Sequence, residues 1–288
     1  MKVQQLKWIY LIILALIWGS SFILIKRGLV GLNPMQVGSL RMIFAAIFLL
    51  IIGFRNLPRI PIYQWKYLAL TAFFGTFIPA FLFAIAQTQI DSSVSSILNS
   101  LTPLNTLIIG TFAFGLQFKR IQIIGVFIGF LGTTLLIFNG AIHHPEQNYY
   151  YAILVLIATI CYATNVNLIK RYLSDLSPLS ISTGNFTVML VPALVILFST
   201  GFMNTVHKVE VQSAVFYIMI LGIVGTGIAN IIFFKLIQMA TPVFATSVTY
   251  LIPIVAFFWG MLDEEMLTIV QLLGASIILF GVYLTSKK

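Results

Sequence analysis

The sequence predicts an all-α integral membrane protein with ten transmembrane helices, built as two inverted repeats of five helices each. The first observation behind this fold class is composition: 60% of the 288 residues are hydrophobic and only 8% are charged, whereas a soluble domain carries about 25% charged residues. The second is that short sequence patterns recur in order at about half the chain length, as an internal duplication produces. The third is the segregation of basic residues between alternate loops.

Ten apolar segments are each long enough to cross the hydrocarbon layer, which takes about 20 residues of helix. Clusters of charged and turn residues separate them at 8–25, 35–54, 66–86, 93–116, 121–138, 149–168, 179–199, 214–234, 243–262 and 267–284. The linkers are short, so no soluble domain fits between two spans. We therefore expect one transmembrane domain, with the first unit at 1–140 and the second at 141–288.

The basic residues predict that both termini are cytoplasmic, because cytoplasmic loops carry an excess of Lys and Arg. With this orientation, all of the 16 Lys and Arg residues lie on the inner side except Lys26, Arg27 and Lys208, which lie outside, and Arg41, which lies within a span. An error of one span would scramble the segregation.

The duplication is visible in matched segments of the two halves. The tetrapeptide LIKR occurs at 24–27 and at 168–171; Asn33-Pro34 matches Ser177-Pro178, YLALTAFFGT from Tyr67 matches YIMILGIVGT from Tyr217, and LTP ending at Pro103 matches LIP ending at Pro253. Because five is odd, the second unit enters the membrane from the opposite side. Such inverted units form a site near the midplane that rocking motions expose to each side in turn, so the arrangement predicts a transporter.

A family resemblance follows from the order of these motifs. The units open like LALIWGSSFILIK, place an arginine in the next span within SLRMIF, continue with SSILNSLTPL or TSVTYLIPI, and end with EEMLTIVQLLGASIILFGVYL. Over essentially the whole chain this resembles the EamA family of the drug/metabolite transporter superfamily. The resemblance implies a permease of the bacterial cytoplasmic (inner) membrane, often an exporter of amino acids or related metabolites, with spans 1, 3, 4, 6, 8 and 9 around a central cavity. The glutamate that family members place before the last span is Glu265, whereas the first unit has Leu116 and Gln117 in the corresponding region.

Polar groups in hydrocarbon are costly unless they are paired or face water, so they mark candidate binding residues. Trp18 and Ser21 share a face of span 1, and Tyr162 and Asn165 share a face of span 6. An aromatic ring beside a hydroxyl or amide suits an amphipathic organic solute. Ser and Thr are also common in helix packing, so a structural role stays open for each of these hydroxyls.

Spans 4, 8 and 9 add further candidates. In span 4 a polar stripe at helical spacing should face the cavity; its members are Ser95, Asn99, Thr102 and Thr106. Span 8 supplies Asn230, and span 9 supplies Thr249 and Tyr250. Asn99, Asn165 and Asn230 each carry an amide with four hydrogen-bonding sites, which favours a wet cavity.

Arg41 is the only charged residue well inside a predicted span. It lies about six residues, or roughly 9 Å, from the outer end of span 2. Its guanidinium can bind a substrate carboxylate; the alternatives are that it extends to the lipid headgroups or ties helices together.

Four residues are candidates for gating or coupling. Pro103 and Pro253 lack a backbone donor and free carbonyls in the preceding turn, which can bind a substrate ammonium; the alternative is a kink in which Ser and Thr side chains satisfy these carbonyls. Lys26 and Arg27 lie outside, against the charge rule, so we expect Lys26 at the outer mouth of the pathway, with a lipid-facing role as the alternative. Because no Asp or Glu lies in the predicted hydrocarbon region, we expect any coupling to use Glu265, Lys26 or the charge of the substrate itself.

Several function classes are disfavoured. Cys161 is the single cysteine and the three histidines fall in outer loops, so we expect no metal site and no cofactor. The net charge of +9 comes from short turns rather than a basic patch, which argues against nucleic acid. No P-loop is present. The expected partners are a small-molecule substrate and the lipid bilayer, in a monomer or homodimer. The alternatives to a permease are an integral-membrane enzyme and a channel or lipid-handling protein of the same fold, and the substrate is left open.

Overall fold

A computed structural model describes residues 3–90, 92–141, 148–261 and 269–285. Within these ranges every regular element is a helix and no strand occurs. The α-helices are α1 (Val3–Leu29), α2 (Pro34–Gly53), α3 (Trp65–Ala72), α4 (Ile78–Ala86), α5 (Ser92–Leu98), α6 (Thr102–Phe114), α7 (Arg120–Ala141), α8 (Ala152–Tyr172), α9 (Pro178–Ser199), α10 (Val209–Ile220), α11 (Ala229–Met239), α12 (Pro242–Thr246), α13 (Val248–Met261) and α14 (Ile269–Thr285). The all-α prediction is therefore confirmed for the described part of the chain.

Shorter helical segments join or interrupt these helices. Four lie at their ends: η1 (Phe54–Arg59), η2 (Ile62–Gln64), η5 (Tyr149–Tyr151) and η6 (Phe202–Asn204). A 3₁₀ turn, η4 (Asn99–Leu101), separates α5 from α6. Two π-helical segments, η3 (Phe73–Phe77) and η7 (Leu221–Ile228), continue α3 into α4 and α10 into α11.

Seven segments of the described residues are long and apolar enough to cross a membrane. They are Gln5–Leu29, Pro34–Arg59, Ile62–Ala86, Val94–Phe114, Ala152–Tyr172, Pro178–Ser199 and Val209–Met239. Each overlaps one of the predicted spans, and the shorter apolar helices Arg120–Gly132 and Pro242–Val255 overlap two more. These helices make the chain a multi-pass membrane protein, whereas the count of ten stays a prediction.

The helices α2 and α9 begin with the same local chemistry. Before α2, Asn33 Oδ1 accepts a hydrogen bond from the backbone N–H of Gln36 (2.9 Å). Before α9, Ser177 Oγ accepts one from the backbone N–H of Ser180 (3.0 Å). In both helices a proline follows the cap residue, where its missing N–H leaves no bond unmade. Both caps belong to the matched Asn-Pro and Ser-Pro pairs of the sequence.

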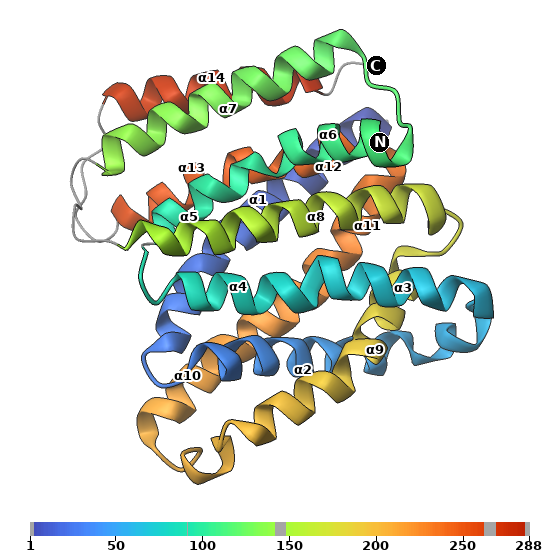
Figure 1. The fold of residues 1–288 in the computed structure, drawn as a ribbon, viewed down its shortest axis with the longest axis vertical. Coiled ribbons are helices and arrows are strands. Elements are labelled where there is room, and N and C mark those ends of the chain that lie inside the picture. Colours follow the sequence, from blue (N-terminus) through green and yellow to red (C-terminus); the bar gives the residue numbers. More distant parts are fainter. Residues whose placement is uncertain (1–2, 91, 142–147, 262–268, 286–288) are drawn as a thin grey trace.

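The packing of the helices comes in matched pairs. Helix α7 lies along α14, as an outer layer at the top of Figure 1, and α2 lies along α9. Helix α1 packs on α13 as α6 packs on α8, and α1 packs on α10 and α11 as α8 packs on α3 and α4. Each of these contacts is repeated by the helices that hold the corresponding places in the other half of the chain.

The π-helical segments also correspond, since η3 and η7 contain the matched glycine-threonine pairs of the two halves. Each glycine lies against a polar side chain of another helix: a Cβ added to Gly75 would lie 2.5 Å from Asn165 Cγ, and one added to Gly225 would lie 2.9 Å from Ser21 Oγ. Such π segments are frequent at functional sites. Here α8 packs closely against the wide turns of η3, and α1 packs closely against those of η7.

Candidate functional site

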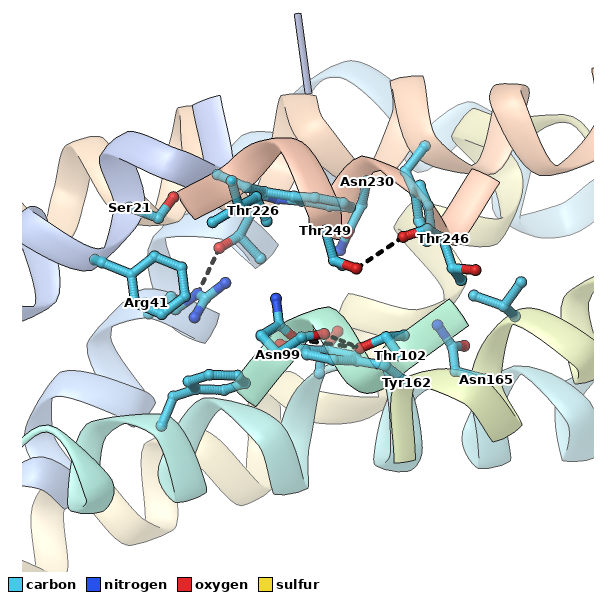
Figure 2. A pocket seen from close by; sticks show the side chains of 18 of the residues that line it. Ser21, Arg41, Asn99, Thr102, Tyr162, Asn165, Thr226, Asn230, Thr246 and Thr249 are labelled. Carbon is cyan, nitrogen blue, oxygen red and sulfur yellow. Dashed lines mark hydrogen bonds between the residues drawn. The ribbon is translucent and has the colours of Figure 1, made fainter. Parts of the chain in front are cut away.

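A cavity of about 90 Å³ lies among helices drawn from both halves of the chain. Its lining comprises Trp18, Ser21, Phe22, Ile25, Arg41, Gly75, Thr76, Phe83, Asn99, Thr102, Tyr162, Asn165, Val166, Thr226, Asn230, Phe233, Thr246, Thr249 and Ile252. These residues belong to the predicted spans 1, 3, 4, 6, 8 and 9, with Arg41 of span 2 added. Nine of the ten predicted substrate-binding residues are among them, and those that Figure 2 labels converge from opposite sides of the cavity.

Arg41 is the only charged residue in this lining. Its Nε donates a hydrogen bond to Thr226 Oγ1 (2.7 Å), and the same hydroxyl donates to the Leu221 carbonyl (3.1 Å) within η7. The side chain therefore crosses from α2 to η7 and points into the protein (Figure 2), so it does not extend to the lipid headgroups. The two Nη atoms make no hydrogen bond or ion pair to any residue that the structure describes, which leaves four N–H donors available to the cavity.

Three amides face the cavity at the places where the sequence predicts them. Asn165 is only 3% exposed, and its Oδ1 has no hydrogen-bond partner within the described ranges. Asn99 Oδ1 accepts a bond from Thr102 Oγ1 (3.3 Å), which leaves its Nδ2 directed into the cavity (Figure 2). Asn230 approaches from the opposite wall on α11. Buried amides that lack protein partners need water or a solute to satisfy them.

Aromatic rings form the apolar part of the walls. Trp18 packs edge-on against Phe233 with ring centroids 4.9 Å apart, and its Nε1 donates to the Gly225 carbonyl (3.0 Å) in η7. On the other wall Phe83 stacks on Tyr162 with ring centroids 6.0 Å apart and an angle of 27° between the ring planes. Because these rings pack on one another, the apolar surface that they present is fixed in position.

The prediction that Tyr250 binds substrate is wrong. Its side chain is fully buried, and its hydroxyl donates to the Val126 carbonyl (2.9 Å) of α7. The ring fills the space above Gly129, where an added Cβ would lie 2.6 Å from it. Tyr250 follows Thr249 by one position, or about 100° around the helix, and so it points away from the cavity that Thr249 lines.

For both prolines the structure agrees with the alternative in which Ser and Thr side chains satisfy the carbonyls that the proline leaves free. Pro103 stands in the first turn of α6, and the Asn99 carbonyl four residues before it accepts a bond from Thr102 Oγ1 (2.7 Å). Pro253 lies inside α13, and the Thr249 carbonyl that it frees accepts a bond from Ser100 Oγ (3.0 Å). Hydroxyl groups thus occupy both carbonyls that were predicted to bind an ammonium group.

The prediction that the polar stripe of span 4 faces the cavity is only partly correct. The 3₁₀ turn η4 breaks the helix, so Asn99 and Thr102 line the cavity whereas Ser95 and Thr106 are buried elsewhere. Lys26 is exposed at the end of α1 and is not part of the lining. Glu265 lies outside the described residues.

Thr76 and Thr226 are lining residues that sequence reasoning missed, although both stand in the matched FFGT and IVGT segments. Their repetition in the two halves is the signal that could have identified them. Among the described residues, no group of three or more His, Cys, Asp or Glu side chains could hold a metal ion.

An all-helical, multi-pass membrane protein with a polar cavity between its helices has the architecture that a membrane transporter requires. The comparisons with known proteins agree with this class and specify the family. The EamA-like transporter family matches residues 6–138 and 150–287, so the chain belongs to that family.

Relatives of similar length carry transporter names. The chain is 25% identical to an uncharacterized transporter of Archaeoglobus fulgidus, over 98% of this chain and 99% of that one. It is 25% identical to the uncharacterized inner membrane transporter YedA of Escherichia coli, over 95% and 88% of the two chains, and 24% identical to a probable amino-acid metabolite efflux pump of that organism, over 95% and 92%. A solved crystal structure superposes with a TM-score of 0.73 at 13% identity, covering 96% of this chain and 94% of the other, which supports the fold alone.

Proposed function

We propose that this protein is a permease that moves a small organic carboxylate with an apolar or aromatic body through the central cavity by alternating access. Arg41 carries the proposal, because it is a cation among otherwise neutral lining residues and its Nη atoms have no partner among the described residues. A guanidinium in such surroundings favours an anion, and its planar donors match a carboxylate.

The remaining lining residues suit the rest of such a solute. The rings of Trp18, Phe83 and Tyr162 offer apolar faces, and the amides of Asn165 and Asn230 can donate to or accept from a polar group of the solute. No carboxylate side chain belongs to the described lining, so a cationic solute would meet Arg41 without a counter-charge.

Amino acids and related metabolites are the first candidates, with export as the direction. Two relatives, from Escherichia coli and Salmonella typhimurium, are named probable amino-acid metabolite efflux pumps. A zwitterion would place its carboxylate at Arg41 and its ammonium group against the neutral oxygen of an amide such as Asn165.

The proposal includes the topology on which alternating access depends. Ten transmembrane helices form two inverted five-helix units, 1–140 and 141–288, with both termini in the cytoplasm. The paired helix contacts and the two π segments at matched positions support it. Cysteine-accessibility labelling from each side of the membrane tests this topology, and a cytoplasmic location of Lys208 would contradict it.

Uptake into vesicles that contain the purified protein and an unlabelled solute tests the function. A panel of amino acids, nucleosides and polyamines, each radiolabelled, distinguishes solute classes. We expect saturable, competitive exchange of one carboxylate class. Replacing Arg41→Gln should reduce this exchange by at least about tenfold, since a charge-assisted hydrogen bond is lost, whereas Arg55→Gln, an exposed arginine of η1, should leave it unchanged.

The same assay separates the alternatives. A channel would give flux that does not saturate or respond to solute on the opposite side, a lipid-handling protein would exchange none of these solutes, and a membrane enzyme would convert the solute chemically. Any of these outcomes contradicts the proposal.

A further inference from the structure

Lys170 holds two helices together at one end of the protein. It lies in the last turn of α8, and its Nζ donates to the carbonyls of Ile237 (3.0 Å), Gln238 (3.5 Å) and Ala240 (3.0 Å) at the end of α11. These are carbonyls that a helix end leaves without intrahelical donors, and a cation there is also favoured by the helix dipole. One ammonium group thus uses its three donors to close the gap between α8 and α11.

A second side chain supports the same closure. Gln238 Nε2 donates to the Leu176 carbonyl (2.7 Å) in the segment between α8 and α9. On the neighbouring surface, the rings of Tyr67 and Tyr172 stack with centroids 4.2 Å apart. The end of the protein near Lys170 is therefore tied by hydrogen bonds and by packed rings.

Lys26 holds the corresponding place in the other half, within the other copy of LIKR, but it makes no such contact. Its side chain is exposed, and it forms no hydrogen bond or ion pair with any described residue. The carbonyls that correspond to those bound by Lys170 belong to Gln87, Thr88 and Ile90 at the end of α4, by the match of the FFGT and IVGT segments. Helices α8 and α11 pack on each other, and α1 meets α4 through the rings of Phe22 and Phe83, whose centroids lie 5.8 Å apart, so the two ends differ in the contacts of the two lysines.

The two lysines lie at opposite ends of the molecule. Figure 1 shows α1 and α8 running in opposite directions, so their C-terminal turns point to opposite ends of the cavity that both helices line. The unequal contacts of two identical tetrapeptides are what one conformation of an inverted-repeat carrier should show, because each conformation closes one end and opens the other.

We propose that Lys26 and Lys170 are paired gating residues that exchange roles during transport. In the present conformation Lys170 clamps the end of α11 and closes the cytoplasmic end of the cavity. In the opposite conformation Lys170 releases these carbonyls, and Lys26 clamps the carbonyls at the end of α4 to close the outer end. The inference rests on the proposed function, since it requires two inverted units that alternate.

Distances between pairs of spin labels, measured by pulsed electron paramagnetic resonance on the full chain in lipid nanodiscs without solute, test the proposal. One pair reports the α1–α4 end, at Val30→Cys and Gln89→Cys; the other reports the α8–α11 end, at Asp175→Cys and Lys235→Cys. All four positions are exposed, and the buried Cys161 is replaced by Ala to prevent unwanted labelling. The variants are Lys26→Gln and Lys170→Gln, with the adjacent Arg27→Gln and Arg171→Gln as matched controls.

We expect Lys170→Gln to lengthen the distance at the α8–α11 end and to shorten it at the α1–α4 end. The ratio of molecules closed at the α8–α11 end to molecules closed at the α1–α4 end should change about tenfold. Lys26→Gln should shift the ratio in the opposite sense, the double variant should lie near the unsubstituted protein, and the two arginine controls should change neither distance.

Unchanged distances in Lys170→Gln, or a shift of the same sense in both variants, would overturn the proposal. If Lys170→Gln does not fold, the Lys26→Gln variant alone tests the proposal, because the Lys26 side chain is exposed. In that variant, an unchanged fraction of molecules with the α1–α4 end closed would contradict the proposed clamp. The distances are measured without solute, so a failure to transport carboxylates would refute the proposed function and leave this result standing.

Discussion

Gly75→Ala is expected to damage solute binding while leaving the protein folded. The new Cβ would lie 2.5 Å from both Asn165 Cγ and Asn165 Nδ2, which is about 1 Å closer than ordinary van der Waals contact. The obstacle is the end of a side chain next to a cavity, so the Asn165 amide can move by rotation. Displacing this amide removes one hydrogen bond to the solute, which corresponds to about a tenfold rise in apparent KM.

The assay is exchange in reconstituted vesicles, together with thermal unfolding in detergent. Gly281→Ala is the matched control, because its Cβ would lie 2.5 Å from the backbone nitrogen of Gly129, outside the cavity. Backbone cannot rotate aside, so α7 and α14 must separate, at a cost of about 1–3 kcal/mol in stability. We expect the first variant to change KM with little change in Tm, and the second to lower Tm with unchanged KM. A normal KM in Gly75→Ala would refute the placement of Asn165 in the solute site.

The remaining predictions concern hydrogen bonds between helices. Tyr250→Phe removes the bond to the Val126 carbonyl and should lower stability in thermal unfolding by about 0.6–1.7 kcal/mol; because the ring lies outside the cavity, an altered KM would contradict its assignment to packing. Ser100→Ala leaves the Thr249 carbonyl beside Pro253 without its donor and should cost about 1–3 kcal/mol, whereas Ser100→Thr, which keeps a hydroxyl, should cost less. Equal losses in the two variants would show that the hydroxyl does not satisfy this carbonyl.

The sequence predicted the features that depend on local chemistry. Long apolar runs must become spans, and an amide in hydrocarbon must find water or a partner, so the amino-acid sequence alone is enough to assign Asn99, Asn165 and Asn230 to a cavity. The matched Asn-Pro and Ser-Pro pairs, which the sequence offered only as a sign of the duplication, begin two helices in the same way, since a capping side chain acts within its own turn.

Features that depend on distant contacts could not be predicted. The partner of Arg41 is Thr226, which is 185 positions away, and the donor to the Thr249 carbonyl is Ser100, which is 149 positions away. The turns η3, η4 and η7 also change the angle per residue, so a stripe drawn with a constant period of 3.6 residues fails beyond them. This explains why the expected stripe of span 4 lines the cavity only at Asn99 and Thr102.

The LIKR copies illustrate both cases. The repeat itself was evident in the sequence, and the charge rule assigned the inner copy to topology and the outer copy to a functional role. In the structure the second copy carries the hydrogen bonds, because Lys170 reaches the end of α11, a contact that no local pattern encodes. The role of Lys26 stays a prediction, for which the gating proposal supplies a specific set of acceptors.

The most direct test of a carboxylate site at Arg41 compares each exchanged solute with its neutral amide. In the unsubstituted protein, the carboxylate should compete for exchange at least about tenfold better than the amide, because the ion pair with Arg41 strengthens only the former. In Arg41→Gln this preference should disappear while weak binding of both remains. Equal competition by carboxylate and amide in the unsubstituted protein, or a preference that survives in Arg41→Gln, would contradict the account.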